Sequence, residues 1–209
     1  MQHRIAIGIA LTIAALPMPT IAQVANGTFE SGLGSWSLRD ATFQHAVGRT
    51  CANAAYAPSK RSSTTKALSP AAGRVARVTP DVLYTPGSWA LCSELEQTIY
   101  VPMGKQLKFV ARVGEGIHAS RYQIESGALS VVVVAGGKST TLFSQNGHNI
   151  ECLNGQWPCP AYRTHVLNMS PYWGKTVRLI FRGGSSVRNG RLGGISYPSH
   201  AYIDNVRIE

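Results

Sequence analysis

Residues 201–209, AYIDNVRIE, end the chain and are the best guide to its fold. In a strand, alternate side chains share a face, so the even-numbered residues from Tyr202 to Ile208 are expected on one face and the odd-numbered residues on the other. The mostly apolar face then includes Asp204. Because burying an unpaired carboxylate is costly, Asp204 is expected at a sheet rim, bonded by backbone amides, or on a cation. The stretch at 26–30, NGTFE, is the best candidate to supply its partner.

The first 22 residues have the pattern of a secretory signal peptide. Residues 1–4 are positively charged, residues 5–16 are mostly apolar, and Thr20 and Ala22 are small residues where a signal peptidase reads. About 12 apolar residues are too few for a membrane span, which needs roughly 20. The sequence predicts removal of residues 1–22 and a single domain at 23–209, secreted or periplasmic, with no membrane span.

The composition is basic, with a formal net charge of +10 that becomes +9 once Arg4 leaves with the signal. A basic exported domain favours acidic partners such as anionic polysaccharide, lipid head groups or nucleic acid. A generally cationic surface kept for solubility explains the same charge. Because the lysines and arginines form no runs, nucleic acid is not expected as a partner.

Four cysteines in an exported chain indicate disulfides, at Cys51, Cys92, Cys152 and Cys159. Cys152 and Cys159 bracket the turn-forming hexapeptide LNGQWP, so the sequence favours pairing them with each other and, by elimination, Cys51 with Cys92. A zinc site is the alternative, but the chain has no CxxC pair and no histidines at ligand spacing.

Short runs of β-forming residues recur between glycine, proline, asparagine and serine. Residues 107–113 alternate apolar and polar, which predicts a half-buried strand, and the apolar run at 129–135 predicts a central strand covered on both faces. Further strands are expected at 74–79, 97–101 and 176–182. Many strands without helices between them predict antiparallel sheets packed face to face. Long loops, often functional, are expected at 114–127, 144–161 and 183–200.

Several stretches together resemble the carbohydrate-binding modules of families 4, 9 and 22 and, more broadly, the galactose-binding-like jelly rolls. The matching stretches are NGTFE at 26–30 with GSW at 34–36, GRVARVT at 73–79, QTIYV at 97–101, the strand at 107–112, LNMSPYWGKTVRL at 167–179 and YIDNV at 202–206. The resemblance implies an all-β jelly-roll β-sandwich (galactose-binding-domain-like) and a carbohydrate ligand. It also implies a structural calcium site where the opening and closing strands meet, held by Glu30 and Asp204. The alternative is that Glu30 and Asp204 only accept backbone hydrogen bonds.

Catalytic residues are not evident. Catalysis by paired carboxylates needs two acids that converge on one bond, and the chain has only 10 acidic residues, of which Glu94 and Glu96 share a strand face. A serine nucleophile on a GxSxG turn is absent from the sequence. We therefore expect a protein that is not an enzyme.

Sugar binding uses aromatic rings that stack on a pyranose and polar groups that bind its hydroxyls. Trp157 lies between Cys152 and Cys159, where a disulfide would hold its ring in place, and it is the main candidate. Arg121, Gln123 and Arg188 are candidates for polar or anion contacts, and the arginine-rich loops favour acidic glycans. The sequence thus predicts a secreted, non-catalytic carbohydrate-binding protein. The alternative is a structural or adhesive envelope domain that binds other exported proteins and no small ligand.

Overall fold

The computed structural model describes residues 24–44, 51–58, 63–65, 73–78, 89–113, 123–146, 161–188 and 201–209. The predicted signal peptide, residues 1–22, lies outside these ranges, so its removal stays a prediction.

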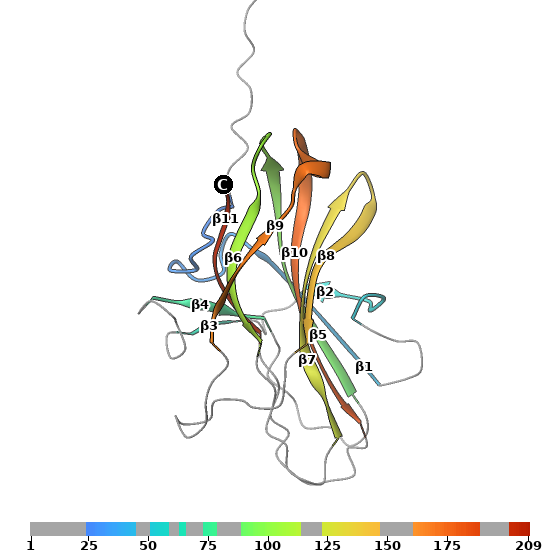
Figure 1. Cartoon of the computed structure of the whole chain (residues 1–209). Coiled ribbons are helices and arrows are strands. Elements are labelled where there is room, and N and C mark those ends of the chain that lie inside the picture. The colour runs from blue at the N-terminus through green and yellow to red at the C-terminus, as the bar shows by residue number, and fades with distance from the viewer. Residues whose placement is uncertain are drawn as a thin grey trace, which may run out of the picture.

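Two antiparallel sheets packed face to face form the domain (Figure 1). The six-stranded sheet has the order β2-β1-β5-β10-β7-β8, with β1 at Ser37–Gln44, β2 at Ala57–Pro58, β5 at Trp89–Val101, β7 at Gln123–Ala135, β8 at Lys138–Asn146 and β10 at Lys175–Arg188. The five-stranded sheet has the order β3-β4-β11-β6-β9, with β3 at Ser63–Thr65, β4 at Val75–Arg77, β6 at Leu107–Val113, β9 at Arg163–Leu167 and β11 at Ala201–Ile208. A short 3-10 turn, η1, spans Ser170–Tyr172. The predicted all-β jelly-roll sandwich is confirmed.

The core lies between the sheets and follows the predicted alternation. In β6 the side chains of Leu107, Phe109, Ala111 and Val113 are buried in this core. The apolar run of β7 has Val131 and Val133 in the core, while Val132 is buried on the opposite face, as expected for a strand covered on both sides. Burying an aliphatic or aromatic side chain contributes about 1.5–3 kcal/mol, so these rows hold the two layers together.

Three strands are longer than the sequence indicated. β5 begins at Trp89, β7 at Gln123, and β10 continues to Arg188. Gln123 and Arg188 were expected in loops, and this was wrong because backbone pairing with neighbouring long strands carries polar and glycine-rich residues into the sheet. β8 and β9, which lie at sheet edges, were not predicted because edge strands have polar sequences with little alternation.

The last strand contains a β-bulge that changes which face its side chains occupy. Asp204 pairs with Val110, and the register shifts before Arg207 pairs with Lys108. Asn205 has a φ of 51°, a left-handed conformation that asparagine tolerates better than most residues. Strict alternation over 202–208 was therefore wrong. Ile203, Val206 and Ile208 are in the core, whereas Tyr202 and Asp204 are on the outer face with Arg112 and Val110.

The opening segment packs against this closing strand. The backbone N–H of Val206 donates to the Gly27 carbonyl at 2.9 Å, and a Cβ on Gly27 would lie 1.9 Å from the Val206 oxygen. Only glycine allows this approach. Phe29 and Trp36 are buried in the core beside this contact, with ring centroids 5.5 Å apart.

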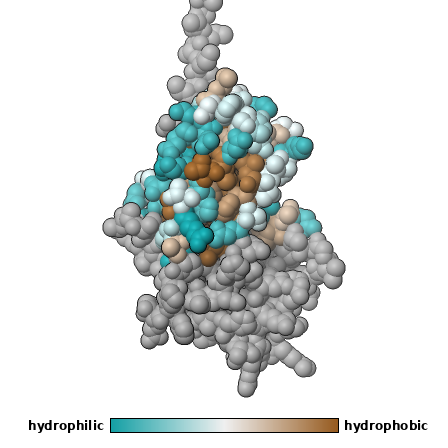
Figure 2. All heavy atoms as spheres, in the orientation of Figure 1, coloured by the Kyte–Doolittle hydropathy of each residue, from teal (hydrophilic) through white to brown (hydrophobic). Residues whose placement is uncertain are grey.

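The edge strands β8 and β9 lie on the same side of the sandwich. His165 of β9 stacks on Phe109 and contacts Phe143 of β8, and burial, with the charge of Arg163, lowers the pKa of His165. Hydrophobic residues gather in the middle of the face shown in Figure 2. The described residues include no helix with the length and hydropathy of a membrane span.

Candidate ligand-binding face

The outer face of the six-stranded sheet carries a row of charged side chains. Residues paired directly across antiparallel strands point to the same face, and Glu94 of β5 is paired with both Arg39 of β1 and Arg182 of β10. Glu96 of β5 and Arg178 of β10 continue this row. We call these five residues the charged row.

Two ion pairs of different burial form within the charged row. Arg182 donates from Nε to Glu94 Oε1 at 2.9 Å, and the side chains of Glu94 and Arg182 are only 2% and 14% exposed. Arg178 donates from Nε to Glu96 Oε1 at 2.7 Å and from Nη2 to Glu96 Oε2, with side chains 43% and 17% exposed. The hydrogen bond from Arg178 to Glu96 raises the pKa of the guanidinium.

Arg39 is within ion-pair distance of both glutamates but is hydrogen-bonded to neither. Its Nη1 is 3.8 Å from Glu94 Oε2 and 3.9 Å from Glu96 Oε2, both longer than a hydrogen bond. Its Nη2 donates instead to the backbone carbonyl of Tyr56 at 3.2 Å. The side chain remains 35% exposed. The charged row therefore has three guanidinium groups for two carboxylates, with the excess charge on Arg39.

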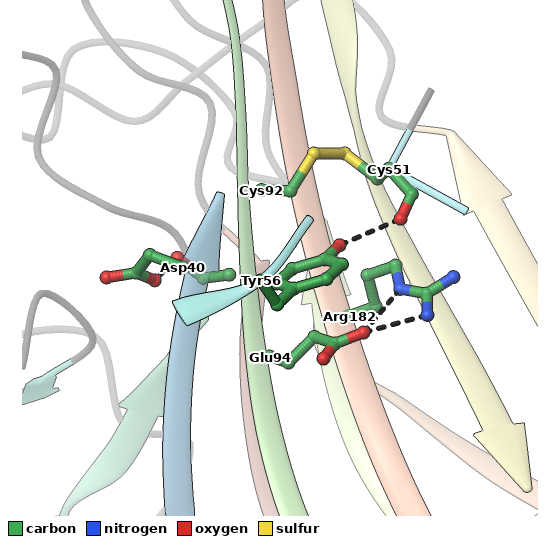
Figure 3. Close-up of a disulfide and its surroundings, with 7 residues drawn as sticks. Asp40, Cys51, Tyr56, Cys92, Glu94 and Arg182 are labelled. Atoms are coloured by element: carbon green, nitrogen blue, oxygen red, sulfur yellow. Dashed lines mark hydrogen bonds and ion pairs between the residues drawn. A yellow bond between two sulfur atoms is a disulfide. The ribbon is translucent and has the colours of Figure 1, made fainter. Parts of the chain in front are cut away.

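Residues 51–58 border the charged row and are attached to it by Tyr56 and a disulfide (Figure 3). The Tyr56 ring is within cation–π range of both Arg39 and Arg182, at 5.7 and 5.5 Å, and its hydroxyl donates to the Cys51 carbonyl at 2.9 Å. Burial raises the pKa of Tyr56 well above its usual range, so the phenol stays neutral. The Cys51–Cys92 disulfide, predicted by elimination, is confirmed.

Two apolar side chains, which we call the apolar floor, and a row of hydroxyl side chains on β8 lie on the same face as the charged row. Ile180 and Val132, paired across β10 and β7 on the same outer face, are 3% and 1% exposed, so neighbouring side chains cover them. β8 places Ser139, Thr141 and Ser144 on this face by pairing with outward residues of β7, and all three are exposed. The guanidinium groups and the exposed hydroxyls are groups that can bind the acid groups and hydroxyls of a sugar.

The predicted ligand residues are only partly described. Trp157 and Arg121, together with Cys152 and Cys159, lie outside the described residues. Gln123 and Arg188 are brought opposite each other, because β7 and β10 pair them at the end of the six-stranded sheet. The charged row was missed, although Glu94 and Glu96 were seen to share a face. Their arginine partners come from strands far away in the chain, and no local pattern connects them.

Glu30 and Asp204, the predicted calcium ligands, lie where the opening and closing segments meet. Glu30 Oε1 accepts from the Arg74 N–H at 2.8 Å, and Asp204 Oδ1 accepts from the Asn205 N–H at 2.7 Å. Burial and the charge of Glu30 raise the pKa of Asp204, and the Asn205 hydrogen bond lowers it by a smaller amount, so the net pKa is raised. Among the described residues there is no group of three or more acidic, histidine or cysteine side chains that could hold a metal. Calcium also accepts backbone carbonyls, and its binding by Glu30 and Asp204 stays a prediction.

The two antiparallel sheets make this chain a β-sandwich domain of the jelly-roll class. No protein-family model matches the chain. No curated protein matches its sequence.

Solved structures with the same overall arrangement do match. The K1 cleaved adhesin domain of Lys-gingipain from Porphyromonas gingivalis is 14% identical, with 87% of this chain and 95% of that chain covered and a TM-score of 0.52. The carbohydrate-binding module TmCBM61 in complex with β-1,4-galactotriose is 14% identical, covering 89% and 96%, with a TM-score of 0.46. The CBM27-1 module of Caldicellulosiruptor saccharolyticus, in complex with mannohexaose, is 15% identical, covering 81% and 90%, with a TM-score of 0.42. At these identities the likeness concerns the fold alone.

Proposed function

We propose that this protein is a secreted or periplasmic, non-catalytic carbohydrate-binding domain that takes a glycan on the outer face of its six-stranded sheet. The observation that carries the proposal is the arrangement of this face. The guanidinium groups of the charged row and the exposed hydroxyls of β8 share one face, on which Ile180 and Val132 are covered by their neighbours. The sequence resemblance to carbohydrate-binding modules supports it.

Acidic glycans suit this face better than neutral ones. The charged row has one more cation than anion, and the chain as a whole has a formal net charge of +10. A positive surface raises the local concentration of an anionic polymer and speeds its association. Arg188 and Gln123, with Trp157 and Arg121, are proposed to extend the site at the end of the sheet where β7 and β10 pair.

Blocking the face is expected to remove glycan binding. Thr141 is exposed on β8 beside the apolar floor, so Thr141→Tyr would place a bulky ring where the sugar lies. We expect at least a tenfold loss of affinity, about 1.4 kcal/mol, in calorimetric titrations with uronic-acid polysaccharides. Thr164→Tyr is the matched control, because Thr164 is an exposed threonine on β9, the edge strand of the other sheet.

Equal affinity of Thr141→Tyr and Thr164→Tyr would place the site elsewhere. Trp157→Ala in the same titrations tests the proposed extension, where loss of one stacked ring should cost about 1–3 kcal/mol by analogy with stacking on bases. If the wild-type protein bound no glycan of an acidic and neutral panel, the structural or adhesive alternative would replace this proposal.

Calcium is proposed as a structural cofactor held by Glu30 and Asp204. A cation bound only to the folded state stabilises it by mass action, about 2.7 kcal/mol at a concentration one hundred times the Kd. A chelator should therefore lower the melting temperature of calcium-loaded protein, and Asp204→Asn should abolish this sensitivity. Asp40→Asn is the control, since Asp40 is a buried carboxylate on another strand. An identical melting curve with and without chelator, in protein shown to contain metal, would contradict the proposal.

A further inference from the structure

The charged row contains one cation, Arg39, that is in ion-pair range of two glutamates and hydrogen-bonded to neither; we call this arrangement open. Arg178 and Arg182 each make direct hydrogen bonds to one glutamate, whereas Arg39 stays 3.8 and 3.9 Å from both. A guanidinium has more N–H donors than the single bond to the Tyr56 carbonyl uses. Its remaining donors, with more than a third of the side chain exposed, are available to an anion from outside.

Tyr56 explains why Arg39 does not turn onto the carboxylates. Its backbone carbonyl accepts from Arg39 Nη2, and its ring lies 5.7 Å from the Arg39 guanidinium carbon. The ring also contacts Arg182, and its hydroxyl is bonded to the carbonyl of Cys51, which the disulfide links to β5. Figure 3 shows Tyr56 between the Cys51–Cys92 disulfide and Arg182. The position of Arg39 is therefore set by groups that are themselves fixed to the sheet.

We propose that Arg39 is the residue of this face that binds the carboxylate of a uronic-acid sugar, and that Tyr56 is the positioning residue that keeps Arg39 open for it. The inference rests on the proposed function and names its ligand class. A planar guanidinium matches a carboxylate with two parallel N–H···O bonds, which a neutral sugar cannot accept in the same way. Arg39 therefore provides selectivity for charge, while the β8 hydroxyls bind any sugar.

The test compares two variants that each remove one positive charge. Arg39→Gln alters the charged row, and Arg207→Gln alters a half-exposed arginine of β11 in the other sheet. Each is titrated calorimetrically with polygalacturonate, alginate and a glucuronate polymer, and with the methyl esters of these polymers, which keep the backbone and lose the charge. We expect Arg39→Gln to weaken binding of an acidic polymer about tenfold or more, with no change for its methyl ester. Arg207→Gln should change the affinity for the acidic polymer and the affinity for its methyl ester by less than about twofold.

Two Tyr56 variants test the positioning role. Tyr56→Phe keeps the ring, and should retain the preference of the wild-type protein for acid over ester. Tyr56→Leu removes the ring, lets Arg39 close onto Glu94 and Glu96, and should reduce both this preference and its salt dependence to the level of Arg39→Gln. Because leucine keeps the backbone carbonyl, a Tyr56→Leu protein with the full preference would overturn the positioning role of the Tyr56 ring. Melting curves verify that each variant is folded.

The outcomes separate the inference from the proposed function. Equal losses in Arg39→Gln and Arg207→Gln, or equal wild-type affinity for acid and ester, would overturn the role of Arg39 while glycan binding stands. A wild-type protein that binds neither acidic nor neutral polymers would overturn both.

Discussion

Glu94→Gln is expected to lower the free energy of unfolding by about 3–5 kcal/mol, the cost of breaking a buried ion pair by removing one partner. Glu94 is 2% exposed, and its carboxylate binds Arg182 at 2.7–2.9 Å. Glutamine keeps the shape but not the charge, so the guanidinium of Arg182, 14% exposed, would be left with no compensating anion in contact. Urea unfolding followed by fluorescence measures the change.

Glu96→Gln is the matched control, because Glu96 is on the same strand and face and pairs with the more exposed Arg178. Exposed ion pairs contribute up to about 1 kcal/mol, so this variant should be nearly as stable as the wild-type protein. A double variant, Glu94→Leu with Arg182→Met, removes both charges and should recover most of the loss. Similar losses for Glu94→Gln and Glu96→Gln would show that burial does not determine the strength of these pairs.

Replacing both Cys51 and Cys92 by alanine is expected to cost about 4 kcal/mol by the loop-entropy account, given their separation of 41 residues. The disulfide joins residues 51–58 to β5, so its loss frees this segment in the unfolded chain and loosens Tyr56 in the folded one. Urea unfolding of the double alanine variant measures the effect, and reduction of the wild-type protein should reproduce it.

Cys152→Ala with Cys159→Ala is the comparison variant, for which the shorter predicted loop gives roughly 2–3 kcal/mol. Peptide mapping without reduction checks the connectivity directly. A peptide that joins Cys51 to Cys152 would contradict both pairings, and a smaller loss for the Cys51 and Cys92 variant than for the Cys152 and Cys159 variant would contradict the loop-length argument.

Most of the core was predictable from the sequence, whereas most of the candidate site was not. The alternation of residues 107–113 and the apolar run at 129–135 identify their buried side chains directly, because the two-residue period of a strand is a property of its own backbone. The candidate site depends on pairs such as Glu94 with Arg182, which are 88 residues apart in the chain. Such a pair forms only when two strands meet in one particular register, and local patterning does not specify that register.

For the two ends of the chain, too, the sequence determined some features and the tertiary structure others. By itself, the sequence indicated an all-β fold, and its resemblance to carbohydrate-binding modules implied that the stretches at 26–30 and 201–209 are the opening and closing segments. Only the tertiary structure decided that Asp204 faces outward, because the bulge before Arg207 adds one residue and moves the following side chains to the other face. Tertiary structure alone also decided which arginine of the charged row stays open. That choice depends on how β1, β5, β10 and residues 51–58 meet, and the contacts of Arg39 with Glu94, Glu96 and Tyr56 exist only once these segments are assembled.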